Sequence, residues 1–422
     1  MRNEPLIGLL WTNAGSWLGR RPRRKWAAAP ALLGSRLVFQ GALYGLTILV
    51  ARTTELGEFG SFAASFSLAG LLVGGPCNGL GVYVARTTAR GTSVELLSVI
   101  RTMSVFAAVG ITGLGILSIV LTALDPLTAG SCGLFFFSLS IANLVSGLNT
   151  AVGRPYLAAV LELSTGLTLM CLVALCAIAG TGIPLLLTIA AVGVLAVTTV
   201  VWRSRPSSEP RIYANEERMS LRRLFRRSIP FIAMGSASAG YARLDVALAA
   251  IATSSTVVAP YAAASRLLGP VALIGSTFGS LFLPIAVAAG DQDIRGILRR
   301  ARVSLGAVLI PIAVVLAVAA TPLMSLVYGA EYASGASALR ILAISVIPYA
   351  WYWPGAHLLN SRGREWRWLA ILAAVLSVNA ILVFILTPQL QAAGIAIAWL
   401  ITETCTAMLV IWQLRRLPTD RG

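Results

Sequence analysis

The chain has 422 residues, of which 57% are hydrophobic and only 12% charged, and its formal net charge is +17. A soluble domain has roughly a quarter of its residues charged, so this composition excludes a water-soluble globular protein. The basic residues lie between apolar stretches and do not form one face of a soluble domain, which argues against nucleic-acid binding. The chain is therefore predicted to be an all-α polytopic membrane protein.

Apolar windows long enough to span a bilayer recur along the whole chain. A spanning helix needs about 20 apolar residues, and this length is met about twelve times. In chain order the windows are residues 29–51, 60–85, 102–123, 132–150, 156–178, 183–202, 229–250, 256–285, 303–323, 338–360, 368–387 and 392–413. About twelve transmembrane helices are therefore expected.

The charges of the connections predict the topology. The even-numbered connections and both ends of the chain hold nearly all basic residues outside the spans, whereas the odd-numbered connections hold only Arg52 and Arg340. Cytoplasmic loops are enriched in arginine and lysine. Both termini are therefore predicted to be cytoplasmic, which requires an even number of spans.

The sixth connection is the longest and most polar, so we interpret it as a linker between two six-helix lobes around a central cavity. Residues 51–64 and 252–264 are similar outside turns, which indicates a parallel repeat of the kind found in several transporters. The predicted organisation is a cytosolic basic segment, an N-lobe with spans 1–6, an arginine-rich linker, a C-lobe with spans 7–12 and a cytosolic tail. Their residues are 1–28, 29–202, 203–228, 229–413 and 414–422.

Enzyme signatures are missing from the sequence. Lys25 is the only lysine, so no phosphate-binding loop of the GxxxxGK type exists. The single histidine, His357, has no partner at metal-site or triad spacing, and it is expected to be a packed or interfacial residue. We predict no catalytic residue, no metal site and no cofactor, and leave coupling to H⁺ or Na⁺ open.

Ionisable residues inside the apolar spans are the candidates for function, because each costs about 2.5–3.5 kcal/mol at a helix centre. The predicted substrate-binding residues are Arg36, Arg243 and Arg266, since a guanidinium suits phosphate and carboxylate. The predicted ion-coupling or salt-bridge residues are Asp245, Glu403 and Glu162. Whether Asp245 pairs with Arg266 or Arg36, and whether the arginines bind cargo, stays open at this point.

Aromatic residues cluster in the tenth span, as Tyr349, Trp351, Tyr352 and Trp353. They either stack on sugar rings or serve as interfacial anchors and packing residues. The second interpretation is favoured.

Four stretches resemble the polysaccharide-export (oligosaccharidyl-lipid) flippases of the multidrug/oligosaccharidyl-lipid/polysaccharide (MOP) superfamily. The first carries Gly57, Glu58, Phe59 and Gly60, and the second carries Asp245, Tyr261, Ala264 and Arg266. The four stretches are residues 49–86, 244–270, 328–364 and 391–403. The resemblance implies a V-shaped cavity between two lobes that rock in alternating access.

The cargo implied by this resemblance is a polyprenyl-pyrophosphate-linked oligosaccharide: an O-antigen, capsule or exopolysaccharide repeat unit. It would be flipped from the cytoplasmic to the outer leaflet of a bacterial inner membrane. Membrane lipids, a polysaccharide polymerase and chain-length proteins are the implied partners, and nucleic acid is not one.

Three alternatives remain. An ion-coupled multidrug or small-molecule exporter of the same superfamily would not need three arginines inside its spans. A membrane polymerase or ligase would need a larger outside loop. The flippases of the peptidoglycan precursor are nearer, but they usually have two further helices, so the resemblance favours the polysaccharide-export family.

Overall fold

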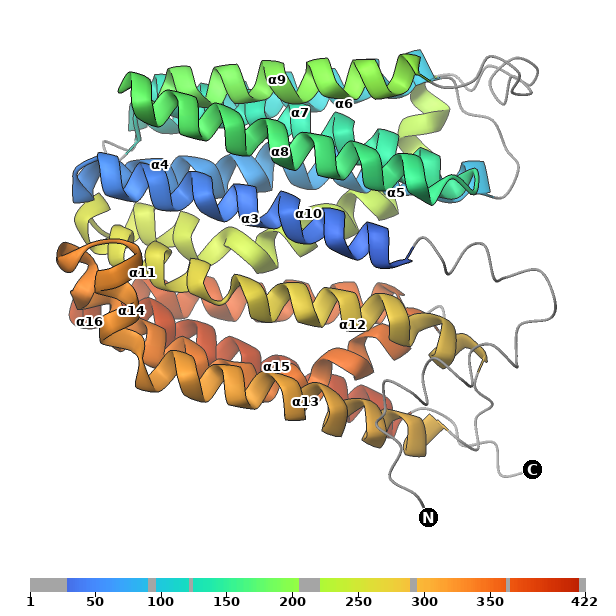
Figure 1. Cartoon of the computed structure of the whole chain (residues 1–422). Helices are drawn as coiled ribbons and strands as arrows, with labels where there is room; N and C mark the ends of the chain where they lie inside the picture. The colour runs from blue at the N-terminus through green and yellow to red at the C-terminus, as the bar shows by residue number, and fades with distance from the viewer. Residues whose placement is uncertain are drawn as a thin grey trace.

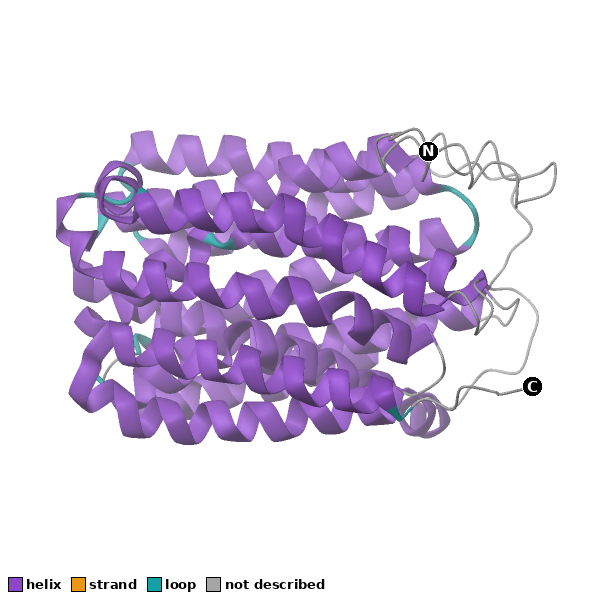
Figure 2. Cartoon of the chain, turned by 90° about the horizontal axis from the view of Figure 1, so that it is seen from below, coloured by secondary structure: helices purple, strands orange, loops and turns teal. Residues whose placement is uncertain are grey.

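The computed structural model describes residues 29–89, 96–120, 124–204, 221–288, 294–361 and 365–416. The predicted N-terminal segment, most of the predicted linker and most of the tail lie outside these residues. Every regular element in the described ranges is a helix (Figure 2), and the long helices run side by side.

The first half forms one layer of the bundle (Figure 1). Its second span is a single long helix with a π-helical turn, η1, in the middle. The elements are α3 (Ala29–Thr53), α4 (Leu56–Ala69), η1 (Gly70–Gly74), α5 (Gly75–Ala89), α6 (Leu96–Val120), α7 (Pro126–Ala151), α8 (Pro155–Ala179) and α9 (Ile183–Arg203). Asp125 caps α7 by accepting a hydrogen bond from the Thr128 amide at 2.7 Å, which satisfies one of the free amides of the first turn.

The second half forms the other layer. Its eighth span is bent by 43° between α11 and α12. The elements are α10 (Leu221–Ala252), α11 (Ser255–Leu267), α12 (Gly269–Ala288), α13 (Ile294–Val318), α14 (Ala320–Val327), η2 (Ala330–Gly335), α15 (Ala336–Ser361) and α16 (Glu365–Arg415).

The long helix α16 is a hairpin of two spans. Gln391 has a left-handed φ of 51° that interrupts the helix. The arms face each other, because the Asn379 side-chain amide donates to the Thr402 hydroxyl at 3.1 Å and Arg367 donates to Gln413 at 3.2 Å. The apolar windows predict a short loop at residues 388–391. In the structure residues 388–390 continue the first arm, so Gln391 alone makes the turn.

The span count follows from these helices. In the described ranges, nine helices are long and apolar enough to cross a membrane, and the bent α11–α12 pair makes a tenth. The second arm of α16 and the charged helix α10 complete the set. The prediction of about twelve spans in two lobes is confirmed.

The two lobes touch through glycines on the second span. A Cβ at Gly235 of α10 would lie 2.5 Å from the Gly75 carbonyl oxygen and 2.8 Å from the Gly79 Cα. Near the end of the same span that is predicted to face outward, Gly60 packs directly on the Ser255 backbone. Only glycine permits such close backbone approach, so the lobes are in contact at the middle of this helix and near its outward end.

Further contacts join the lobes at the end predicted to face outward. The Arg52 guanidinium donates to the Val327 carbonyl at 2.8 Å and to the Leu326 carbonyl, and the Tyr332 hydroxyl donates to the Ala51 carbonyl at 3.2 Å. The end of α3 is thereby attached to α14 and η2. The V-shaped opening implied by the resemblance is therefore closed at the end predicted to face outward.

Candidate functional site

Arg243 and Arg266 meet at one aromatic ring between the lobes. The guanidinium carbon of Arg243 lies 5.3 Å from the centroid of the Phe66 ring, and that of Arg266 lies 5.2 Å from the same centroid. Arg243 also lies 4.8 Å from the Phe136 centroid. At 1.5 Å per residue, Arg243 lies about 14 Å before the end of α10 at Ala252, and Arg266 lies about 16 Å after the start of α11 at Ser255. Both of these helix ends are predicted to face outward, so the pair lies near the middle of a bilayer.

This arginine pair forms no salt bridge with an acid of the described residues, although Asp245 interacts electrostatically with both arginines. Among the residues that the structure describes, no carboxylate lies within ion-pair distance of Arg243 or Arg266. The Nη1 atom of Arg243 is buried and lacks a hydrogen-bond partner there. Two like charges within apolar spans are costly unless a partner neutralises them, so the pair is suited to an anion brought from outside the chain.

Asp245 does not form the ion pair with Arg266 or Arg36 that the sequence left open. Its carboxylate accepts a hydrogen bond from the Tyr261 hydroxyl and another from the Val246 amide at 2.8 Å. Residues two apart on a helix face different ways, so Asp245 faces α11 while Arg243 faces the aromatic residues of α4 and α7. Tyr261 takes the place of the expected arginine.

Tyrosine hydroxyls complete the surroundings of the pair. Tyr44 of α3 interacts electrostatically with both arginines, and Tyr328 at the end of α14 interacts with Arg266. Burial raises the pKa of the Tyr328 hydroxyl above its ordinary value, so that it stays a hydrogen-bond donor. Tyr44, Phe66 and Phe136 were not singled out from the sequence, because uncharged aromatic residues in apolar spans resemble ordinary packing residues.

Arg36 lies apart from this site and pairs with Glu162. Its Nε is 3.4 Å from a Glu162 carboxylate oxygen, and its side chain is 52% exposed. Ser35 and Ser146 also donate to Glu162, at 3.3 Å and 2.9 Å. The structure therefore brings Arg243 and Arg266 together, whereas Arg36 of α3 pairs with Glu162 of α8.

The Glu162 carboxylate already has Arg36 and two serine hydroxyls as partners, so we expect no coupling role for it. The Glu162→Gln variant should retain at least about half of the transport rate. Its free energy of unfolding should change by no more than about 1 kcal/mol, as is typical of exposed ion pairs. The amide keeps an acceptor for the serines. Transport and melting temperature of the purified protein check this. A complete loss of transport at unchanged stability would instead assign Glu162 a coupling role.

Glu403 forms the centre of a second buried cluster, in the C-lobe. It is 2% exposed, and its Oε2 has no hydrogen-bond partner within the described part of the chain. The hydroxyls of Tyr241 and Tyr352 interact with it and bond to each other at 2.7 Å. An acid in such a place can exchange a proton or hold a small cation, with hydroxyls as additional ligands.

The aromatic residues of the tenth span pack mainly among themselves. The rings of Tyr349 and Trp353 stack with centroids 5.0 Å apart, and the Trp353 indole donates to the Gly275 carbonyl at 2.7 Å. His357 packs edge-on against Trp353 at 4.9 Å. These contacts support the packing interpretation over sugar stacking.

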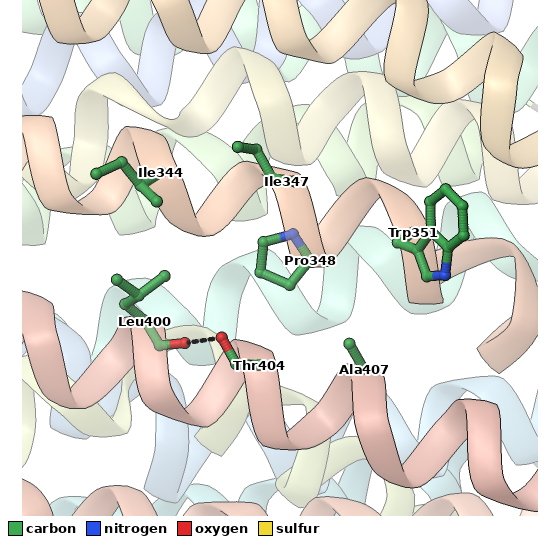
Figure 3. Close-up of a pocket in the computed structure, with 7 residues that line it drawn as sticks. All are labelled: Ile344, Ile347, Pro348, Trp351, Leu400, Thr404 and Ala407. Carbon is green, nitrogen blue, oxygen red and sulfur yellow. Dashed lines mark hydrogen bonds between the residues drawn. The ribbon is translucent and has the colours of Figure 1, made fainter.

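Two cavities lie away from the arginine pair. One, about 370 Å³, is an apolar groove on the outside of the bundle between α15 and α16 (Figure 3), next to the exposed Trp351. The Thr404 hydroxyl in this groove donates to the Leu400 carbonyl of its own helix at 2.8 Å. The other, about 480 Å³, lies at the ends of N-lobe helices beside Glu58 and Asp125. The apolar groove does not suit a charged head group.

Comparison with known proteins places this geometry in a transporter superfamily. The family model "Lipid II flippase MurJ" matches residues 133–420. The solved structure of a lipid II flippase MurJ in an inward closed conformation is similar with a TM-score of 0.71 at 14% identity, covering 93% of this chain and 88% of that one. No curated protein matches the sequence.

Multidrug transporters share the fold. An inward-facing MATE family transporter of the MOP superfamily gives a TM-score of 0.66 at 13% identity, covering 92% of this chain and 98% of that one. The eukaryotic MATE transporter AtDTX14 gives 0.61 at 18% identity, covering 94% and 96%. At such identities the likeness concerns the fold alone.

The membership expected from the resemblance needs correction within the superfamily. The matching model is that of the lipid II flippases, which the helix count disfavours because they usually have two further helices. It is not a model of the polysaccharide-export flippases. The helix count was a poor guide to the family. The family model matches residues from α7 to α16, and this match does not require the two further helices. The chain belongs to the MurJ lipid II flippase family, whose model matches more than half of its length.

Proposed function

We propose that this protein flips a polyprenyl-diphosphate-linked saccharide from the inner to the outer leaflet, and that Arg243 and Arg266 bind its diphosphate. The observation that carries the proposal is the half-buried arginine pair, which forms no salt bridge with an acid of the described residues. Guanidinium groups bind phosphate oxygens in a bidentate manner. An anionic head group would neutralise the pair while the polyprenyl tail stays in the bilayer, and the step needs no covalent chemistry.

The saccharide favoured by family membership is the peptidoglycan precursor lipid II, the substrate named in the matching family model. A polysaccharide repeat unit is the competing cargo, and a polymerase and chain-length proteins are partners only in that case. Both cargoes share the diphosphate, so the arginine pair suits either. In either case we place the protein in the bacterial inner membrane with both termini in the cytoplasm, as the loop charges predict.

An ion-coupled exporter of small molecules is the second candidate, because MATE transporters share the fold. The arginine pair disfavours it for cationic compounds, since a cation would add to two buried positive charges. An anionic small molecule would still fit the pair.

Binding to the purified full-length protein in nanodiscs separates these candidates. The ligands are radiolabelled lipid II, an undecaprenyl-diphosphate oligosaccharide and the organic cation ethidium. We expect both diphosphate lipids to bind, lipid II more tightly, and ethidium to bind at background level. Binding of ethidium without binding of either lipid would overturn the proposal.

We further propose that Glu403 couples transport to a proton or sodium gradient. Glu403→Gln is then expected to slow gradient-driven transport about tenfold or more and to abolish its response to the gradient, because the amide neither takes up a proton nor neutralises a cation. Rates in proteoliposomes under imposed pH or Na⁺ gradients measure this effect. The exposed Glu331 provides the control variant, Glu331→Gln. An unchanged gradient response in Glu403→Gln would remove Glu403 from the coupling mechanism.

A further inference from the structure

Phe66 is the residue that the two arginines share. It lies in the last turn of α4, is 2% exposed, and contacts Phe135 and Phe136 with centroids 6.1 Å and 4.7 Å away. Its ring is therefore held on the side of α7 while both guanidinium groups approach it from α10 and α11. Phe66 belongs to neither α10 nor α11, so a single residue outside both helices contacts both arginines.

Gly70 makes room for the same arrangement. It lies four residues after Phe66, on the same face of the helix, and begins the π-helical turn Gly70–Gly74. A Cβ at Gly70 would lie 2.6 Å from both the Cδ and the Nε of Arg243. Any larger residue must therefore displace the Arg243 side chain. Isolated π-helical turns are frequent at functional sites.

The electrostatics explain why an aromatic ring is needed here. Arg243 and Arg266 repel each other, and Asp245, which interacts electrostatically with both, forms no salt bridge with either of them. The negative face of an aromatic ring attracts guanidinium groups without neutralising them. The ring thus keeps the two groups near one point and leaves them charged for the ligand.

Two guanidinium groups around one ring distinguish between anions. A diphosphate offers two adjacent phosphates, so each guanidinium can donate two hydrogen bonds to a phosphate of its own. A monophosphate fully satisfies only one of them and leaves the other charge buried without a partner, which is costly.

We propose that Phe66 and Gly70 are positioning residues that hold Arg243 and Arg266 together, and that this geometry makes the site select diphosphate over monophosphate lipids. The inference rests on the proposed function, because it assumes that the arginine pair binds the lipid phosphate. It adds a specificity to that function, and it assigns this specificity to two uncharged residues of the N-lobe.

The test compares dissociation constants of undecaprenyl diphosphate and undecaprenyl monophosphate for the full-length protein in nanodiscs. Phe66→Leu removes the ring face and Gly70→Ala displaces Arg243, and each is expected to reduce the diphosphate preference about tenfold. Phe66→Tyr keeps the ring and is expected to stay within about twofold of the unsubstituted protein. Gly81→Ala is the matched control, because its Cβ would meet Leu144 at an ordinary 3.8 Å.

Melting temperatures without ligand separate positioning from folding. Gly70→Ala should leave the melting temperature unchanged, because the Cβ meets a flexible side chain and not the backbone. An unchanged diphosphate preference in Phe66→Leu and Gly70→Ala would overturn the positioning role alone, as would an equal loss in Phe66→Tyr. A failure of the unsubstituted protein to bind undecaprenyl diphosphate would overturn the proposed function as well.

Discussion

Replacing Arg243 and Arg266 together with alanine is expected to lower the transport rate at least about a hundredfold, while the amount of protein in the membrane stays the same. A hydrogen bond to a charged group contributes about 1.5–3 kcal/mol, and the double variant loses such bonds from both arginines. Each 1.4 kcal/mol is about a tenfold effect. Single variants should each lose about tenfold or more.

Lysine variants test the chemistry of this effect. Arg243→Lys and Arg266→Lys keep the charge but lose the planar bidentate donor, so they should retain more activity than the alanine variants and less than the unsubstituted protein. Arg302→Ala is the matched control, because Arg302 is also half-buried but donates to the Trp351 carbonyl at 2.9 Å in another part of the bundle. Normal transport by the double alanine variant would exclude the arginine pair as the cargo site.

The second large effect is expected at the glycine contact between the lobes. Gly235→Val should reduce transport to background, because its side chain would overlap the Gly75 carbonyl and the Gly79 backbone, which cannot move aside. The lobes would then be held apart at the middle of the second span. The contacts of Arg52 and Tyr332 at the end predicted to face outward would remain in place.

Distances between spin labels measure this separation directly. Labels replacing the exposed Val82 of α5 and Phe225 of α10 report on the two lobes in a cysteine-free background. We expect the short distances of the closed state to disappear in Gly235→Val. Gly115→Val is the control, because nothing lies within 4 Å of the Cβ at this position. A Gly235→Val variant with short distances and normal transport would contradict a functional role for the contact.

Much of this arrangement was predictable from the sequence. The apolar windows predicted the membrane helices, which the structure confirms, whereas the orientation that the loop charges indicate stays a prediction. The cost of charges in apolar spans selected Arg243 and Arg266 as candidates, and the structure places both at one ring. The prediction that they bind cargo is still to be tested.

The features that the sequence could not predict depend on contacts between segments that are distant in the chain. The sequence does not show that Arg36 faces Glu162, because ionisable residues on separate helices have no spacing that identifies a partner. Phe66 and Gly70 carry no polar signal, and their importance comes only from the approach of α10. Likewise, the glycines at 75, 79 and 235 resemble ordinary small residues of membrane helices until the lobes are placed together.

Flipping of lipid II by the purified protein in proteoliposomes tests the central claim most directly. Lipid II is placed in one leaflet, and the share that becomes accessible to an impermeant reagent in the other leaflet is followed over time. The arginine-pair account predicts accelerated appearance that is lost when Arg243 and Arg266 are both alanine. Appearance no faster than in protein-free vesicles, for lipid II and for an undecaprenyl-diphosphate oligosaccharide alike, would contradict it.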